Sequence, residues 1–193
     1  MEAEILEETT PADRGAPERI LAFSPPRGER LEWLVEKGVE LGATVFQPLL
    51  WERTPPRARN LRKERLQRIA AAACEQCGRA KLPHLLPPLP LEEFLAEEFL
   101  AKEFQGRAYL LDREGDPPPA GAGEAEEVLL AAGPEGGGTE EEKAALLARG
   151  FRPLRAGAYT LRIETALLAG LTLLSPPPAR KGSPGREGRE GPA

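Results

Sequence analysis

The sequence has few of the residues that build metal sites and covalent catalytic centres. It contains two cysteines and one histidine in 193 residues, whereas a structural zinc site takes four ligands. Cys74 and Cys77 form a C-x-x-C at the end of an expected helix, but a redox pair needs a helix N-terminus, where the dipole lowers the thiol pKa. His84 has no Ser or Cys motif beside it, which argues against a hydrolase triad. We therefore expect packed free thiols and no metal.

Long apolar runs and a basic N-terminal region are also absent. No apolar stretch of the sequence is long enough to span a bilayer. The first residues, MEAEILEE, are acidic, whereas a signal peptide begins with basic residues. These absences predict a cytoplasmic protein that does not enter a membrane. Asn and Met are scarce, and arginine provides most of the 26 basic residues, which suggests a thermophile or a GC-rich genome.

Charge is distributed unevenly along the chain. Residues 19–81 carry thirteen bases and seven acids, whereas residues 82–150 carry five bases and fifteen acids. An arginine-rich segment of this kind is a candidate surface for the phosphates of a nucleic acid. A solvated helix face explains the same pattern, and both interpretations stay open at this point.

Short apolar runs alternate with helical patterns, which predicts a parallel α/β sheet. Pro48 argues that its strand is an edge strand or is broken. The second helix has an apolar stripe of Leu66, Ile69, Ala70, Ala73 and Cys77. The expected strands are 20–23, 44–51, 108–111, 128–132 and 151–154, and the expected helices are 29–41, 61–78, 91–104, 139–149 and 161–174.

The glycine-rich turn that follows the apolar run VLLAA, residues 128–132, is the strongest local signal. Gly133, Gly136, Gly137 and Gly138 give the backbone freedom to adopt positive φ and let a ligand approach closely. Thr139 is then expected to cap a helix, with Glu142 completing a capping box. The carboxyl end of a buried strand is where open α/β sheets bind ligands. The turn lacks the G-K-[ST] end of a Walker loop and the G-x-G-x-x-G pattern, so neither nucleotide motif is supported.

Four motifs in a fixed order carry a resemblance to a known family. They are RGERLEWLVEKGVELGATVFQPLLWERT, ACEQCGR, GPEGG and LRIETA. The chain resembles the 16S ribosomal RNA uridine methyltransferases that modify ring nitrogen 3, within the SPOUT class of knotted methyltransferases. The resemblance covers roughly residues 20–175. It implies a methyltransferase domain at 19–175, with 1–18 as a disordered segment or the remnant of a missing N-terminal β-barrel domain and 176–193 as a disordered basic tail.

The resemblance implies a deep C-terminal trefoil knot, a homodimer, and S-adenosylmethionine as cofactor. Three turns would hold the cofactor: the loop after Leu111, the GPEGG turn and the turn from Ala156 to Arg162. The substrate would be ribosomal RNA or the small ribosomal subunit. The cofactor-binding residues implied are Leu111, Gly133, Pro134, Glu135, Gly136, Gly137, Ala156, Gly157, Leu161 and Thr165.

Methyl transfer to an imide nitrogen requires removal of its proton or stabilisation of the charge on the flanking carbonyl oxygens. Arg162 is the candidate for that stabilisation, because a guanidinium can bridge carbonyl oxygens. Glu164 and Glu135 are candidates for accepting the proton or for orienting Arg162. Glu164 is alternatively a first-turn residue that the helix dipole favours. The residues expected to bind RNA are Arg27, Arg30, Arg53, Arg57, Arg59, Gln76 and Arg79, the last two of which are alternatively expected to reach the site.

The sequence also departs from the family pattern. Residues 156–162 read AGAYTLR where L-G-x-R-I-L-R is usual, and Gly138 replaces the usual aromatic residue after GPEGG. These changes bear on cofactor packing and substrate binding. Two interpretations therefore remain: an active ribosomal RNA methyltransferase, or a divergent knotted dimer that binds RNA or a nucleotide without methyl transfer.

Overall fold

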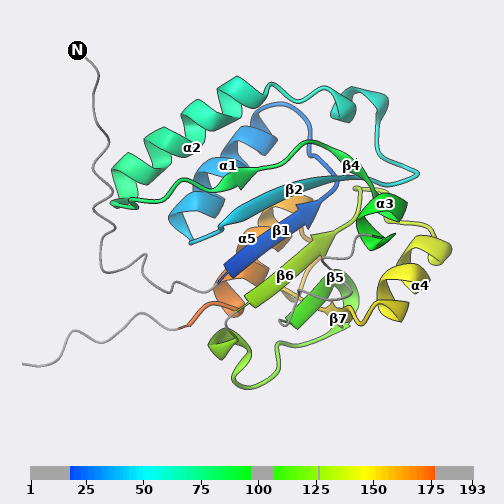
Figure 1. Ribbon diagram of the computed structural model, residues 1–193. Coiled ribbons are helices and arrows are strands. Elements are labelled where there is room, and N and C mark those ends of the chain that lie inside the picture. The colour runs from blue at the N-terminus through cyan, green and yellow to red at the C-terminus, as the bar shows by residue number, and fades with distance from the viewer. Residues whose placement is uncertain (1–17, 97–106, 126, 177–193) are drawn as a thin grey trace, which may run out of the picture.

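The computed structural model describes residues 18–96, 107–125 and 127–176, and these form one open α/β domain (Figure 1). Of the expected terminal segments 1–18 and 176–193, residues 1–17 and 177–193 lie outside the described residues. The strands are β1 (Glu18–Phe23), β2 (Val45–Leu50), β3 (His84–Leu85), β4 (Leu89–Pro90), β5 (Arg107–Asp116), β6 (Glu127–Ala132) and β7 (Arg152–Leu154). The α-helices are α1 (Glu29–Glu40), α2 (Lys63–Cys77), α3 (Leu91–Ala96), α4 (Glu140–Ala148) and α5 (Ile163–Leu173), with short 3-10 helices η1 (Pro56–Arg59) and η3 (Ala122–Glu124).

The strands form one sheet in the order β3-β2-β1-β6-β5-β7, with β4 also paired to β2, and every pairing is parallel. The expected parallel α/β architecture is confirmed. Successive residues of β6 enter opposite cores: Val128 and Leu130 pack on one face, and Leu129 and Ala131 on the other. Both faces of the central strands are therefore covered, which explains their uninterrupted apolar sequences.

Helices cover the two faces unequally (Figure 1). One core contains residues of α1, α2 and α5, and the smaller second core contains residues of α3 and α4. Helix α1 approaches β2 closely, because a Cβ at Gly38 would lie 2.8 Å from the Phe46 ring. None of the helices in the described segments is long and apolar enough to cross a membrane.

The expectation that Pro48 marks an edge or broken strand is wrong. Strand β2 is continuous from Val45 to Leu50 and is flanked by β1 on one side and by β3 and β4 on the other. The Phe46 carbonyl accepts a hydrogen bond from the Leu86 N–H at 3.0 Å. Alternate residues of a strand direct their backbone groups to the same side, so the backbone nitrogen of Pro48 faces the side on which Phe46 bonds to the chain after β3. At this point β3 has ended and β4 has not begun. The missing N–H of Pro48 therefore falls at a gap between two short strands that the sequence did not predict.

The apolar stripe of α2 also differs from the expected one. Leu66, Ala70, Ala73 and Cys74 are buried, whereas Cys77 is exposed. Cys74 therefore occupies the core position assigned to Cys77. Strand β5 continues to Asp116, beyond the expected end at residue 111. Helix α3 begins at Leu91, as expected, and residues 97–104 of the expected helix lie outside the described residues.

Candidate cofactor and RNA site

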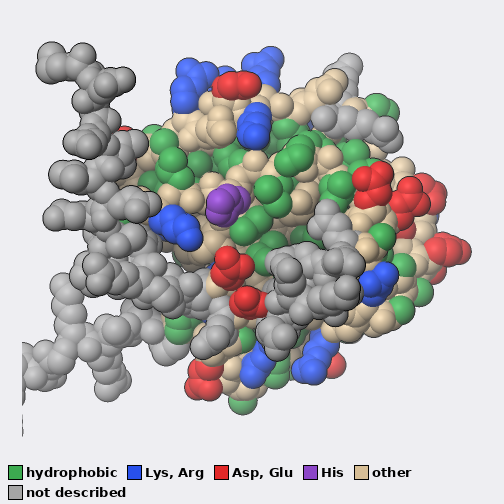
Figure 2. Space-filling view, viewed as in Figure 1, with side chains coloured by type: hydrophobic (Ala, Val, Ile, Leu, Met, Phe, Trp, Pro, Cys, Tyr) green, Lys and Arg blue, Asp and Glu red, His purple; other side chains and the backbone are tan. Residues whose placement is uncertain are grey.

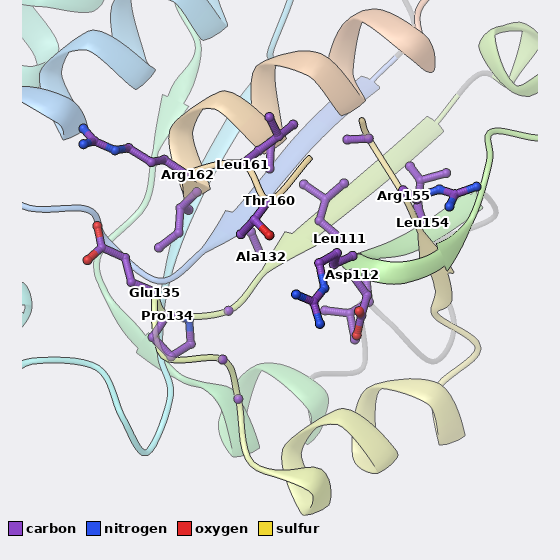
Figure 3. Close-up of a pocket in the computed structure, with 18 of the residues that line it drawn as sticks. Leu111, Asp112, Ala132, Pro134, Glu135, Leu154, Arg155, Thr160, Leu161 and Arg162 are labelled. Carbon is purple, nitrogen blue, oxygen red and sulfur yellow. The ribbon is translucent and has the colours of Figure 1, made fainter. Parts of the chain in front are cut away.

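A cavity of about 520 Å³ opens at the carboxyl edge of the sheet, between β5, β6, β7 and the start of α5 (Figure 3). Three turns that are distant in sequence meet there: the bulge after Leu111, the glycine turn from Gly133 to Gly138, and the turn from Arg155 to Arg162. This edge is where open parallel sheets bind ligands. The cavity volume lies within the range of roughly 300 to 1,000 Å³ that is usual for small-molecule sites.

The glycine turn forms because β6 ends at Ala132 and α4 is capped at Thr139. The Gly137 N–H donates to the Pro134 carbonyl at 2.8 Å, and Gly137 has a φ of 75°, which favours glycine. The Glu142 N–H donates to the Thr139 hydroxyl at 3.2 Å, and the Thr139 N–H donates to the Glu142 carboxylate at 2.8 Å. The expected capping box is confirmed, and it holds the end of the turn in place.

A bulge in β5 supplies polar residues to the opposite wall. Leu111 and Asp116 both pair with Leu154 of β7, so the residues between them leave the ladder. Asp112 and Arg113 consequently line the cavity, and the Asp112 carboxylate lies 3.9 Å from the Lys143 ammonium. The resemblance implied a cofactor loop after Leu111, but the bulge, with Asp112 and Arg113 on it, was not predicted, because a register shift depends on the partner strand.

The third turn leads into α5, whose N-cap residue is Arg162. A Cβ at Gly157 would lie 3.2 Å from the Leu161 side chain, so the turn packs closely on itself. Tyr159 lines the mouth of the cavity but is 85% exposed. It therefore lines the cavity without filling it.

Two carboxylates and one guanidinium connect the walls of the site. Arg30, in the first turn of α1, donates to the Glu135 carboxylate at 2.7 Å, and its Nε lies 3.9 Å from the Glu164 carboxylate. Glu164 is 4% exposed, and its Oε2 has no hydrogen-bond partner. Figure 3 shows Glu135 and Arg162 on the same side of the cavity. The expectation that the two glutamates orient Arg162 is corrected, because both carboxylates pair with Arg30.

Most of the expected cofactor residues line the cavity. Gly136 does not line it, although its carbonyl accepts a hydrogen bond from Arg53 at 3.3 Å. Thr165 is exposed on α5, and Glu164 lies buried behind the wall. The expected residues that line the cavity are Leu111, Gly133, Pro134, Glu135, Gly137, Ala156, Gly157, Leu161 and Arg162.

The residues expected to bind RNA lie in several parts of the fold. Arg30 and Arg53 contact the glycine turn. Arg27 is exposed in the loop between β1 and α1, and Arg57 and Arg59 belong to η1. Gln76 is exposed near the end of α2. Arg79 donates to the carbonyls of Val39 and Ala43 at 3.0 and 2.8 Å. Both carbonyls lie where α1 ends, at the amino edge of the sheet, so the expectation that Arg79 reaches the site is wrong.

Several lining residues were not expected from the sequence. Trp51 comes from the end of β2 and is buried against the glycine turn, and Lys143 and Arg155 add positive charge to the rim. The pKa of Glu141 at the start of α4 is lowered first by a hydrogen bond from the backbone N–H of Glu141, then by one from the Thr139 side chain and by the positive charge of Arg53. Figure 2 shows acidic side chains over α4 and basic ones over α2.

Within the described segments, no group of His, Cys, Asp and Glu side chains could hold a metal ion.

The fold and the cavity define a class: parallel α/β proteins whose ligand site lies at the carboxyl edge of the sheet, beside a glycine turn and a capped helix. The chain belongs to the family described as the RNA methyltransferase domain, whose model matches residues 15–175. The resemblance found in the four sequence motifs is thereby confirmed.

Known proteins agree with this assignment. Ribosomal RNA small subunit methyltransferase E of Synechocystis is 43% identical over 75 residues, which cover 39% of this chain and 25% of that protein. The crystal structure of the enzyme of that name from Neisseria gonorrhoeae, bound to S-adenosyl methionine, has a TM-score of 0.71 at 31% identity; the match covers 80% of this chain and 64% of that chain. A Legionella pneumophila methyltransferase in complex with the same cofactor has a TM-score of 0.65 at 30% identity, with 82% and 66% covered.

The aligned region thus spans a quarter of the curated relative and about two thirds of the two solved chains. The similarity of fold extends to more distant relatives. A SpoU methyltransferase from Streptomyces viridochromogenes has a TM-score of 0.51 at 13% identity, and this likeness shows the fold alone.

Proposed function

We propose that this protein is an S-adenosylmethionine-dependent RNA methyltransferase that modifies ring nitrogen 3 of a uridine in 16S ribosomal RNA. The observation that carries the proposal is the meeting of three turns around one cavity, with Arg162 among the lining residues and a buried carboxylate, Glu164, two residues further along in the first turn of α5. The family match and the relatives bound to S-adenosyl methionine support the choice of cofactor.

The residues present fit this cofactor. A Cβ at Gly137, which lines the cavity, would meet no other atom within 4 Å, so a ligand can approach the backbone of the turn closely there. Backbone groups of this kind, together with apolar side chains such as Leu111 and Leu161, suit an adenosine. Lys143 and Arg155 on the rim would attract the carboxylate of the amino-acid part.

When bound, the cofactor supplies a methyl group on a positively charged sulfur. The chain must then align the uracil nitrogen at about 3 to 3.5 Å from that methyl carbon and handle the imide proton. Among the residues that the structure describes, Arg162 has no carboxylate within 4 Å of its guanidinium. Its positive charge is therefore available to a uracil carbonyl oxygen on which negative charge develops.

Of the two candidates for accepting the imide proton, Glu135 lines the cavity, whereas Glu164 lies buried outside the lining and has an unpartnered oxygen. A buried acceptor in that state gains free energy when a donor approaches. Glu135 is half exposed and already accepts from Arg30 at 2.7 Å. We infer that Glu135 holds Arg30 at the edge of the site.

The wider assembly belongs to the same proposal. The protein would act in the cytoplasm as a homodimer, with α5 and the neighbouring turns at the interface, where Tyr159 and Leu173 expose apolar surface. A trefoil knot is supported by the close approach of the chain after α5 to the loop after β5, since a Cβ at Gly123 would overlap the Ser175 carbonyl. The arginines at 27, 53, 57 and 59 would hold phosphates of the RNA.

Transfer of labelled methyl groups from S-adenosylmethionine to 16S ribosomal RNA, or to isolated small subunits, tests the proposal. Nucleoside analysis should show 3-methyluridine. Arg162→Ala should lower turnover by about 10² to 10³, as the loss of one charge-stabilising donor does, while cofactor affinity stays close to that of the wild type. Arg152→Ala removes an exposed arginine of β7 outside the cavity and serves as the matched control. Equal turnover in the two variants would refute the role of Arg162. Cofactor binding without methyl transfer by the wild type would favour a dimer that binds RNA without modifying it.

A further inference from the structure

Trp51 lies beneath the glycine turn, with the outer edge of its indole against the backbone. A Cβ at Gly138 would lie 2.7 Å from Cζ3 and 2.8 Å from Cε3 of Trp51, and a Cβ at Gly133 would lie 3.6 Å from the same ring. Trp51 is 3% exposed, and it belongs to the wall of the cavity. No side chain can be added at residue 138 while the indole is in this position.

The backbone of Trp51 is fixed by a short network of hydrogen bonds. Its N–H donates to the Thr54 hydroxyl at 2.9 Å, and its carbonyl accepts from the Thr54 N–H, also at 2.9 Å. The Thr54 hydroxyl lies 2.9 Å from the hydroxyl of Ser24, which is buried at the end of β1. The turn that carries the indole is therefore anchored to the central strands of the sheet.

The residues after Trp51 bind the same glycine turn and the helix that follows it. The Glu52 N–H donates to Glu142 at 2.7 Å, and the other oxygen of that carboxylate accepts from the N-cap of α4, Thr139. Arg53 donates to the Gly136 carbonyl at 3.3 Å. Trp51 and Arg53 thus contact the glycine turn itself, and Glu52 contacts the first turn of α4 directly after it.

The indole nitrogen shows that packing determines the position of the ring. Trp51 Nε1 is buried and has no hydrogen-bond partner, which costs free energy in a folded protein. The ring holds its place despite that cost. The apolar contact with the glycine turn is therefore the interaction that stabilises the arrangement.

We propose that Trp51 is a positioning residue of the cavity: its indole occupies the space into which a side chain at residue 138 would point, and so sets the position of the glycine wall. One aromatic side chain fills this space, and it can be supplied from residue 51 or from residue 138 but not from both. This gives a physical reason for Gly138, which replaces the aromatic residue expected from the resemblance. The effect on S-adenosylmethionine rests on the proposed function, whereas the packing does not.

A double-mutant cycle tests the proposal, with Trp51→Ser, Gly138→Phe and the combined variant. Each variant is measured by urea unfolding and by titration with S-adenosylmethionine. We expect each single change to weaken cofactor binding by about tenfold, or roughly 1.4 kcal/mol, and to lower the urea midpoint. The combined variant should recover to within about threefold of the wild-type affinity, because coupling between touching residues makes their effects non-additive. Trp33→Ser, on the exposed face of α1, is the matched control and should change neither measurement.

Rescue by the second substitution is the result that a general loss of stability would not give. Additive losses in the combined variant, in both measurements, would overturn the proposal. If Gly138→Phe does not fold alone, Gly138→Ala tests the same overlap, and an unchanged urea midpoint for it would also overturn the proposal. The unfolding measurements need no cofactor. A wild type that fails to bind S-adenosylmethionine but shows the coupling in unfolding would contradict the proposed function and leave the packing role intact.

Discussion

Replacing Arg30 with leucine would leave the buried Glu164 carboxylate without its compensating charge. The two charges are 3.9 Å apart, which corresponds to an attraction of about 4 kcal/mol at an effective dielectric constant of 20. This value is an upper limit, because the Arg30 side chain is 39% exposed and water screens it. Breaking a fully buried pair costs about 3 to 5 kcal/mol, and an exposed pair contributes at most about 1 kcal/mol. For this intermediate case we expect Arg30→Leu to lower the free energy of unfolding by about 1 to 2 kcal/mol.

Urea unfolding at 25 °C measures this change, provided that the slope of the transition stays constant. Adding Glu164→Gln to Arg30→Leu should recover at least half of the loss, because the uncompensated charge is then removed. Glu135→Gln should cost less than about 0.5 kcal/mol, since its pair with Arg30 is largely exposed. The reasoning is refuted if Arg30→Leu unfolds at the wild-type urea concentration, or if Glu164→Gln has the same effect with and without Arg30.

Three further predictions concern the elements around the site. Thr139→Ala should lower the free energy of unfolding by about 1 kcal/mol through loss of the α4 cap; an unchanged urea midpoint would contradict the capping box. Gly38→Ala should cost about 1 to 3 kcal/mol by overpacking against Phe46, although alanine is the better helix former; a more stable variant would show that the ring can move. The hydrogen bonds that lower the pKa of Glu141 stabilise the folded state at pH values above its ordinary 4.5 and cease to do so as the pH falls through the lowered value. Glu141→Gln should therefore reduce the acid dependence of unfolding, and an identical pH profile would contradict it.

The local signals in the sequence predicted the elements that form the cavity. The apolar run before Gly133 is β6, and the Thr139 and Glu142 pair is the α4 cap. Each of these depends on neighbours in sequence, so composition and spacing suffice to predict them. The order of the strands was not predicted, because a parallel architecture is compatible with several orders.

The features that the sequence did not predict all depend on contacts between distant segments. Pro48 is tolerated inside β2 because two short strands leave a gap beside it. Arg79 belongs to a motif that suggested RNA, yet its guanidinium binds carbonyls at the end of α1. Arg30 was assigned to phosphates, and only the fold brings it between Glu135 and Glu164. Side-chain partners across the sheet are set by tertiary packing, which no single segment encodes.

Calorimetric titration of the protein with S-adenosylmethionine tests the central claim, that the cavity at the carboxyl edge of the sheet is a cofactor site. The account predicts one site per chain with a dissociation constant between about 1 µM and 1 mM, the usual range for enzyme substrates. Ala156→Trp places an indole in the cavity and should abolish binding, whereas Ala148→Trp at the exposed end of α4 should not. Absence of binding by the wild type at millimolar cofactor, or equal binding by both variants, would contradict the claim.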